Sequence, residues 1–296
     1  MSPLEDDLSP RAGPDPAPEN QHPAGTAAAP GAAPAQHPKA VPDDLRTPWS
    51  WLHVLLFLLF ALSSLVALDL AFAGYAIIRF HLSQAELLKM ATTNAAYVAA
   101  RQTLWFAGCM LFLLAITRLH FGFPFWRTIG WKPLRPRDMT PLGAAVAFLF
   151  GGGALAIAIS ILAAKVVRTN VKMPIQELLR DRQSVLLLMT LAILLAPVVE
   201  ETIFRGFLYP VLARSFGRPA GVLATGALFG LMHAGQLGNA WGFVALLILV
   251  GVVLTYARAR TGTVLASFLL HLGYNTMLFV SFYIGTHGLR NFPASP

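Results

Sequence analysis

Residues 185–213 read VLLLMTLAILLAPVVEETIFRGFLYPVLA, an apolar stretch that carries two adjacent glutamates and an arginine. The stretch exceeds the roughly 20 residues that a helix needs to cross a bilayer at about 1.5 Å per residue. Lipid offers backbone groups no hydrogen-bond partners, and the alternating pattern of a closed barrel is missing, so we expect a membrane-spanning helix. Its charged side chains then need partners inside the protein.

Six more apolar segments give the chain the pattern of a polytopic membrane protein; they lie at 51–78, 98–119, 141–164, 220–235, 240–257 and 263–285. The chain is 56% hydrophobic and 12% charged, with a mean hydropathy of +0.60, whereas soluble domains are about 25% charged. The segment 220–235 is short for a full span, and residues 80–97 have the mixed composition of an interfacial amphipathic helix. The sequence predicts an all-α, polytopic transmembrane helical bundle of about seven to eight membrane helices.

Residues 1–45 have a different composition, because they are rich in proline, alanine and acidic residues and almost lack aromatic ones. Such a segment cannot bury enough apolar surface to offset the entropy of ordering, so it predicts a disordered N-terminal tail. The first residues, MSPLEDD, contain no basic group and no early apolar run. We therefore expect no cleavable signal peptide.

The formal net charge of +8 is carried mainly by Lys and Arg residues between the apolar segments. Basic residues at such positions contact anionic headgroups, so they predict a lipid bilayer as partner and exclude nucleic acid. With seven spans, eleven basic residues lie on the N-terminal side and nine on the other. This bias predicts a multi-pass protein of the cell membrane, inner or plasma, with a cytoplasmic N-terminus. The single cysteine, Cys109, cannot form an internal disulfide and is expected to be a small buried residue.

Polar residues inside the apolar segments mark the candidate site; they are Asp69, Glu200, Glu201, Arg205, His233, His271 and Asn275. A carboxylate at mid-bilayer costs about 2.5–3.5 kcal/mol, so Glu200 and Glu201 would together cost roughly 5–7 kcal/mol if both were unpaired. Each residue alone has an ordinary structural explanation, and Asp69, which has no clear partner in the sequence, is assigned a structural role. The combination of an unpaired carboxylate with two histidines indicates a functional site.

Helix geometry divides the two glutamates. Glu201 and Arg205 stand at i and i+4 with the acid first, which is the favourable order for a pair on one helix face. Glu200 points about 100° away from Glu201 and is left to face another partner. Pro197 removes one backbone N–H a turn earlier and is expected to kink the helix near Glu200.

The two histidines come from other helices. His233 ends the segment 220–235, where the glycines of GALFG at 226–230 allow a neighbouring helix to approach closely. His271 and Asn275 stand at i and i+4, so they share one face of the last helix. Because each separate buried polar group would need its own partners, we expect the three helices to bring these residues together.

Three short motifs carry a family resemblance. Residues 200–205, EETIFR, look like the EExxxR motif of the CPBP family, which includes the type II CAAX prenyl proteases and bacteriocin-processing enzymes. Residues 229–233, FGLMH, match the FxxxH motif, and residues 271–275, HLGYN, match HxxxN. The motifs occur in the family's order, so the chain is identified as similar to CPBP intramembrane proteases over roughly residues 185–285.

Composition divides the chain into a tail at 1–45 and membrane helices of unassigned role at 46–180, and the resemblance implies a catalytic helical core at 181–290. It implies an endopeptidase that hydrolyses membrane-associated peptides or proteins, including CAAX-type C-terminal processing. In the family picture, the residues matched by Glu200 and His233 activate a water, and those matched by His271 and Asn275 stabilise the oxyanion. The pair matched by Glu201 and Arg205 holds the helix.

Alternatives to a metal-free protease remain open at this point. Glu200, His233 and His271 supply the donor types of some catalytic zinc sites, so a divalent metal is a candidate cofactor. Familiar zinc peptidases, however, place two histidines one turn apart on one helix, and here they lie on separate segments. A non-catalytic peptide-binding or immunity protein would use the same cavity, and a small transporter would use the polar residues as a proton relay. An inverted-repeat transporter would show the polar residues in both halves of the chain, and the N-terminal half does not repeat them, which argues against a transporter.

Overall fold

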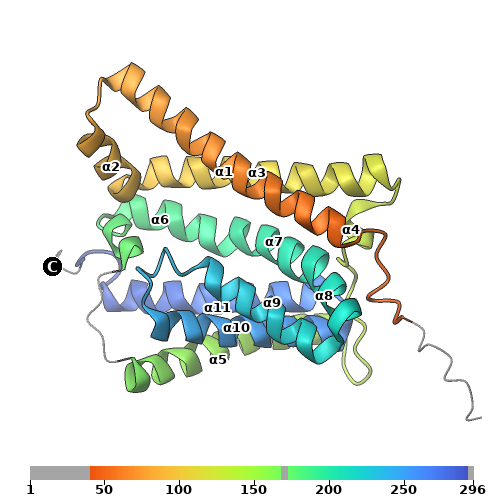
Figure 1. The fold of residues 1–296 in the computed structure, drawn as a ribbon. Helices are drawn as coiled ribbons and strands as arrows, with labels where there is room; N and C mark the ends of the chain where they lie inside the picture. Colours follow the sequence, from red (N-terminus) through yellow and green to blue (C-terminus); the bar gives the residue numbers. More distant parts are fainter. Residues whose placement is uncertain (1–40, 168–172, 293–296) are drawn as a thin grey trace, which may run out of the picture. The chain divides into compact units, whose positions relative to one another are not determined.

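The computed structural model describes residues 41–167 and 173–292, and within them the elements are helices with no strand (Figure 1). This confirms the all-α fold class. Six helices are long and apolar enough to cross a membrane: Trp51–Phe80, Ala95–His120, Pro141–Val166, Arg182–Phe216, Trp241–Thr261 and Val264–Gly285. Residues 1–40, which make up most of the predicted tail at 1–45, lie outside the described residues.

In chain order the elements are α1 (Trp51–Phe80), α2 (Gln84–Thr93), α3 (Ala95–Ala115), a π-helical segment (Ile116–His120), α4 (Phe125–Thr128), α5 (Pro141–Val166), a 3₁₀ segment (Pro174–Leu178), α6 (Arg182–Thr190), a π-helical segment (Leu191–Leu195), α7 (Ala196–Glu201), a π-helical segment (Thr202–Leu208), α8 (Tyr209–Phe216), α9 (Arg218–Met232), α10 (Trp241–Thr261) and α11 (Val264–Gly285). The mixed segment 80–97 contains a short helix of its own, α2, as expected.

Local sequence signals set the helix ends. The side chain of Asn94 accepts a hydrogen bond from the third residue of α3, and Asp181 and Thr140 do the same at the starts of α6 and α5. These caps satisfy backbone N–H groups that have no partner within the helix. Gly262 ends α10 with a φ of 71°, a left-handed conformation that glycine adopts without a steric cost.

The helix from Arg182 to Phe216 carries the EETIFR motif and contains two π-helical segments, one on each side of α7. The first ends two residues before Pro197, which cannot donate a backbone hydrogen bond. Single π-helical turns are frequent at functional sites because they shift the hydrogen-bond register and leave carbonyl groups free. Pro197 therefore lies next to a change of helix type, and the kink expected near Glu200 stays a prediction.

Helix α9 corresponds to the short segment predicted at 220–235, and its 15 residues fall below the length of a full span. It nevertheless runs back through the bundle, so that α8 and α10 run in the same direction (Figure 1). Close approach of α9 to α10 depends on glycine, since a Cβ at Gly226 or Gly230 would overlap the backbone at Val252 or Ile248. The predicted role of this glycine spacing is confirmed.

The described residues, 41–167 and 173–292, belong to one compact unit, and α5 and α11 lie side by side within it. A Cβ at Gly152 would overlap backbone atoms of α11, and one at Gly273 would overlap α5. Helix α5 belongs to the region assigned to the N-terminal half, so the division at 180/181 separates motifs but not structural units.

The end of the predicted tail needs a correction, because residues 41–45 belong to the compact unit. Leu45 is 2% exposed, and Asp44 forms ion pairs with Arg218 and Arg258. The composition of residues 1–45 was read as uniform, whereas a single apolar residue and a single acid suffice to fix the last few residues when their partners come from distant helices.

Asp69 has a partner that the sequence did not reveal. Its carboxylate pairs with Arg101, so the two residues link α1 to α3. This agrees with the structural role that was expected for Asp69. Cys109 is fully buried, also as expected.

Candidate active site

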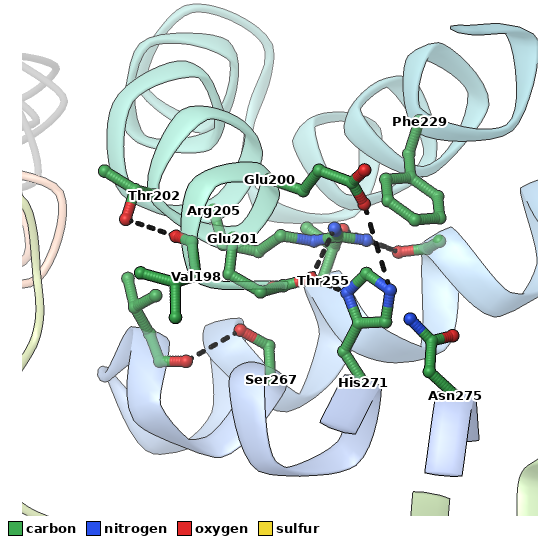
Figure 2. Close-up of polar contacts among 12 residues, drawn as sticks. Val198, Glu200, Glu201, Thr202, Arg205, Phe229, Thr255, Ser267, His271 and Asn275 are labelled. Carbon is green, nitrogen blue, oxygen red and sulfur yellow. Dashed lines mark hydrogen bonds and ion pairs between the residues drawn. The ribbon is translucent and has the colours of Figure 1, made fainter. Parts of the chain in front are cut away.

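Five of the six predicted site residues meet in the interior of the bundle, and Figure 2 shows most of them. The two glutamates project from α7, Arg205 from the π-helical segment that follows, and His271 from α11. His233 lies directly after α9. The expected convergence of three separate helical segments is confirmed for these residues.

Glu201 and Arg205 form a fully buried ion pair. Arg205 Nη1 donates to Glu201 Oε1 at 2.9 Å, and both side chains are 0% exposed. The other guanidinium nitrogens bind α10, because Nε donates to Thr255 Oγ1 at 3.1 Å and Nη2 donates to the carbonyl of Gly251 at 2.8 Å. The arginine also lies over the ring of Phe229, 4.5 Å from its centroid. The predicted pair is therefore confirmed, and it ties two membrane helices together.

His271 is oriented by the same carboxylate. Its Nδ1 lies 2.9 Å from Glu201 Oε1, which also accepts the bond from Arg205. Because an ionised carboxylate only accepts hydrogen bonds, Nδ1 carries the proton and donates it. The opposite ring nitrogen, Nε2, then faces Glu200 Oε2 at 3.8 Å.

His233 is oriented in the same sense by a different acceptor. Its Nδ1 lies 2.8 Å from the carbonyl oxygen of Phe229, one turn earlier, and must donate to it. Nε2 of His233 therefore points away from its own helix, and it lies 4.0 Å from Glu200 Oε1. Both histidines present Nε2 to the same carboxyl group, one to each of its oxygens.

Glu200 forms no ion pair with Arg205, which is paired with Glu201. Its side chain is 11% exposed, compared with 0% for Glu201, and its two oxygens face the two histidines. The side chain of His233 is 18% exposed. The Glu200–His233 side of the cluster is thus more exposed than the Glu201–Arg205 side.

Asn275 lies one turn after His271 on α11, but its amide has a bond that the sequence did not predict. Nδ2 donates to the carbonyl oxygen of Ala192 at 2.8 Å. Ala192 lies in the π-helical segment five residues before Pro197, and the proline has no N–H to give that carbonyl in a π-helical register. Asn275 therefore supplies the hydrogen bond that Pro197 cannot give to the Ala192 carbonyl, and this uses one of the two N–H groups of the Asn275 amide.

Residues 182–277 match a family model described as type II CAAX prenyl endopeptidase Rce1-like. This segment is Rce1-like. The matched residues cover about a third of the chain and contain the EETIFR, FGLMH and HLGYN motifs, so the resemblance to the CPBP family is confirmed. Neither a curated protein nor a solved structure matches the chain.

The Rce1-like match implies protease activity, and the six apolar helices with it support an integral membrane protein. The segment α6–α11 that carries the match contains every predicted site residue. A peptide or protein at the membrane is accordingly the substrate that the family implies.

Two residues in the Rce1-like core escaped the sequence analysis. Thr255 accepts from Arg205 and donates to the Gly251 carbonyl at 2.7 Å, so it completes the shell around the buried guanidinium. Ala192 contributes only a backbone carbonyl. A threonine inside an apolar helix and a backbone atom leave no signal in a sequence, since only the tertiary contact gives them a role.

The candidate zinc ligands can be compared with the geometry that zinc requires. Donor atoms around tetrahedral zinc, at about 2.0–2.1 Å from the metal, lie roughly 3.3 Å apart. Here the nitrogen-to-oxygen distances are 3.8 and 4.0 Å. Within residues 41–167 and 173–292, no group of three or more His, Cys, Asp or Glu side chains is close enough to hold a metal ion. Both observed separations are longer than tetrahedral zinc requires, and a divalent metal stays an untested prediction.

Proposed function

We propose that this protein is an intramembrane endopeptidase in which Glu200 acts as the general base, with His233 beside it, and hydrolyses peptide bonds of membrane-associated substrates. One observation carries the proposal: two histidines, each fixed through Nδ1, direct Nε2 at the two oxygens of one unpaired, nearly buried carboxylate. Glu200 Oε1 and His233 Nε2 are two acceptors suited to binding one water between them, and the carboxylate is suited to deprotonating it.

The separation of Glu200 Oε1 and His233 Nε2 supports a bridging water. A water that donates two hydrogen bonds of about 2.8 Å, at an angle of about 90–105°, spans acceptors roughly 4.0–4.4 Å apart. The observed distance is 4.0 Å. One water between the two groups would donate one hydrogen bond to each, and its lone pairs would be left to face a substrate carbonyl.

The reaction then follows with the protons balanced. Glu200 takes a proton from the water as its oxygen attacks the carbonyl carbon, and the carbonyl oxygen becomes an oxyanion. The protonated Glu200 returns that proton to the leaving nitrogen as the carbon–nitrogen bond breaks, and an acid and an amine are released. General acid–base catalysis of this kind contributes about 10²- to 10⁴-fold.

His271 is suited to stabilising the oxyanion when its Nε2 is also protonated. The hydrogen bond from Nδ1 to Glu201 fixes the ring, so that a proton on Nε2 would be directed toward the Glu200 side of the site. The second N–H of Asn275 would supply another donor. Donors held in place at a water-poor site are typically worth several kcal/mol.

The test is cleavage of a peptide library by detergent-purified protein, alongside the variant Glu200→Gln. Peptides that end in a cysteine, two aliphatic residues and a variable residue should be cut, and farnesylated and unmodified versions of each decide whether a prenyl group is required. Peptide binding without cleavage by the wild-type protein would support a non-catalytic binding protein instead.

A further inference from the structure

A second polar cavity lies apart from the candidate active site and has a volume of about 310 Å³. It lies at the end of the bundle where α1 begins and where α4 is found (Figure 1). The N-terminal segment 43–47, the loop 123–132 and α10, through Arg258, line it, with Gly206 and Pro210 from the helix that carries the active site. None of the predicted catalytic residues is among these.

Positive charge dominates this cavity, which is lined by the cations Arg46, Arg127, Lys132 and Arg258 and the acids Asp43 and Asp44. Asp43 is paired with Arg46 at 3.2 Å, and Asp44 with Arg218, from outside the cavity, at 2.6 Å. In the part of the chain that the structure describes, neither Arg127 nor Lys132 has a carboxylate within 4.0 Å. The cavity therefore has cationic groups available for an anion.

Arg258 provides the strongest indication of a ligand. It is 2% exposed, yet within the described residues Nε and Nη1 make no hydrogen bond. Nη2 donates to the backbone carbonyl of Asp44 at 3.0 Å, and Nη1 lies 3.7 Å from Asp44 Oδ2, a buried oxygen that also makes no hydrogen bond within the described residues. The hydroxyl of Thr47, which also lines the cavity, has no partner either. Buried donors without acceptors are costly, and an oxyanion in the cavity would satisfy them.

The position of the cavity indicates where the anion comes from. Trp51 is the first residue of α1 and Trp126 belongs to α4, and the two side chains are 39% and 53% exposed. Half-exposed tryptophans are typical of the membrane–water interface, where phospholipid headgroups lie. The lining carboxylate of Asp44, close to Arg258, also favours a phosphodiester with one negative charge over a doubly charged free phosphate.

We propose that this cavity binds a phosphate oxyanion and that, in the membrane, the phosphate is the headgroup diester of an anionic phospholipid. Arg258 and Thr47 contact the phosphate from inside the cavity, while Arg127 and Lys132 hold it from the rim. The site is independent of the proposed protease reaction, because it shares no residue with it.

The experiment titrates phosphatidylglycerol into full-length protein that has been delipidated in a nonionic detergent, with bound lipid counted by native mass spectrometry and thermal stability followed in parallel. The test variant is the double substitution Arg127→Gln/Lys132→Gln. Lys132 holds its loop through backbone atoms, which bond the Thr263 hydroxyl at 3.2 and 2.6 Å, so loss of the ammonium leaves the loop in place. The matched control is Arg79→Gln/Lys89→Gln, which removes the same charge from exposed positions on other helices.

Wild-type and control proteins should bind phosphatidylglycerol saturably and gain thermal stability, and the test variant should bind at least tenfold more weakly. Phosphatidylcholine should give neither effect. Equal binding by the test variant and the control would overturn the site. A second arm replaces lipid by inorganic phosphate. Stabilisation by phosphate that the test variant loses, without saturable lipid binding, would overturn the lipid source and assign the cavity to a soluble phosphate.

Discussion

His271 donates through Nδ1 to Glu201 Oε1 at 2.9 Å, and its other nitrogen faces Glu200. The second glutamate of the EETIFR motif thus sets the orientation of a histidine that faces the first. The same Glu201 oxygen accepts a hydrogen bond from Arg205, which also binds α10. One buried carboxylate therefore connects the arginine to the histidine of the site. Glu201 thus joins the EETIFR and HLGYN motifs, whereas His233 of the FGLMH motif faces Glu200.

Glu200→Gln should lower turnover at least about 100-fold, because the amide keeps the shape of the side chain and cannot take the proton from water. The melting temperature and the membrane level should stay near those of the wild type. Asp138→Asn, an acid-to-amide change at an exposed loop position, is the matched control and should keep full activity. Residual activity of Glu200→Gln within tenfold of the wild type would rule out this residue as the general base.

Arg205→Ala should lose activity through instability, because it leaves Glu201 buried without its cation. Breaking a buried pair typically costs about 3–5 kcal/mol. The double variant Glu201→Gln/Arg205→Gln should recover much of the free energy of unfolding, since the glutamine still accepts the bond from His271. Thermal unfolding in detergent measures both. If the double variant is no more stable than Arg205→Ala, the charge of the pair is not what the site depends on.

Asn275→Leu should reduce the free energy of unfolding by about 1–3 kcal/mol, because the partly buried carbonyl of Ala192 loses its donor. Thr276→Ala is the control, since the Thr276 hydroxyl bonds only its own helix, at Leu272. Stability and turnover are measured for both variants. A large fall in turnover at unchanged stability would show that Asn275 serves the oxyanion and not the helix contact.

Deletion of residues 2–40 should preserve insertion and cleavage of a short peptide, because the composition of that segment favours neither packing nor catalysis. Deletion of residues 2–45 should lower the melting temperature, since it removes buried Leu45 and the carboxylate that pairs with Arg218 and Arg258. Membrane level, melting temperature and turnover are compared for the two. Equal melting temperatures would mean that the Asp44 contacts add nothing to stability.

Protein stripped by a strong chelator, and verified as metal-free by elemental analysis, should retain turnover, because the proposed water activation uses only Glu200 and His233. Mock-treated protein is the control. If the stripped protein is inactive and stoichiometric zinc alone restores it, the direct mechanism is wrong. Glu200, His233 and His271 would then become metal ligands, and their donor atoms would have to move closer together than the 3.8 and 4.0 Å observed here.

The sequence by itself determined the helical membrane fold and the candidate site residues. Apolar runs must form helices in lipid, and charged residues within them are costly enough to stand out. The pairing of Glu201 with Arg205 was also predictable, because residues four apart on a helix are neighbours. The three motifs identified the family before any contact was known.

Only the tertiary structure decided which partner each remaining polar group has. His271 and Glu201 are 70 positions apart, Asn275 and Ala192 are 83 apart, and Arg258 and Asp44 are 214 apart. Helix periodicity reaches only about one turn along the chain, so it carries no information on contacts between helices. The roles of Thr255, of the Ala192 carbonyl and of residues 41–45 follow from helix packing, which brings atoms together irrespective of their distance in sequence.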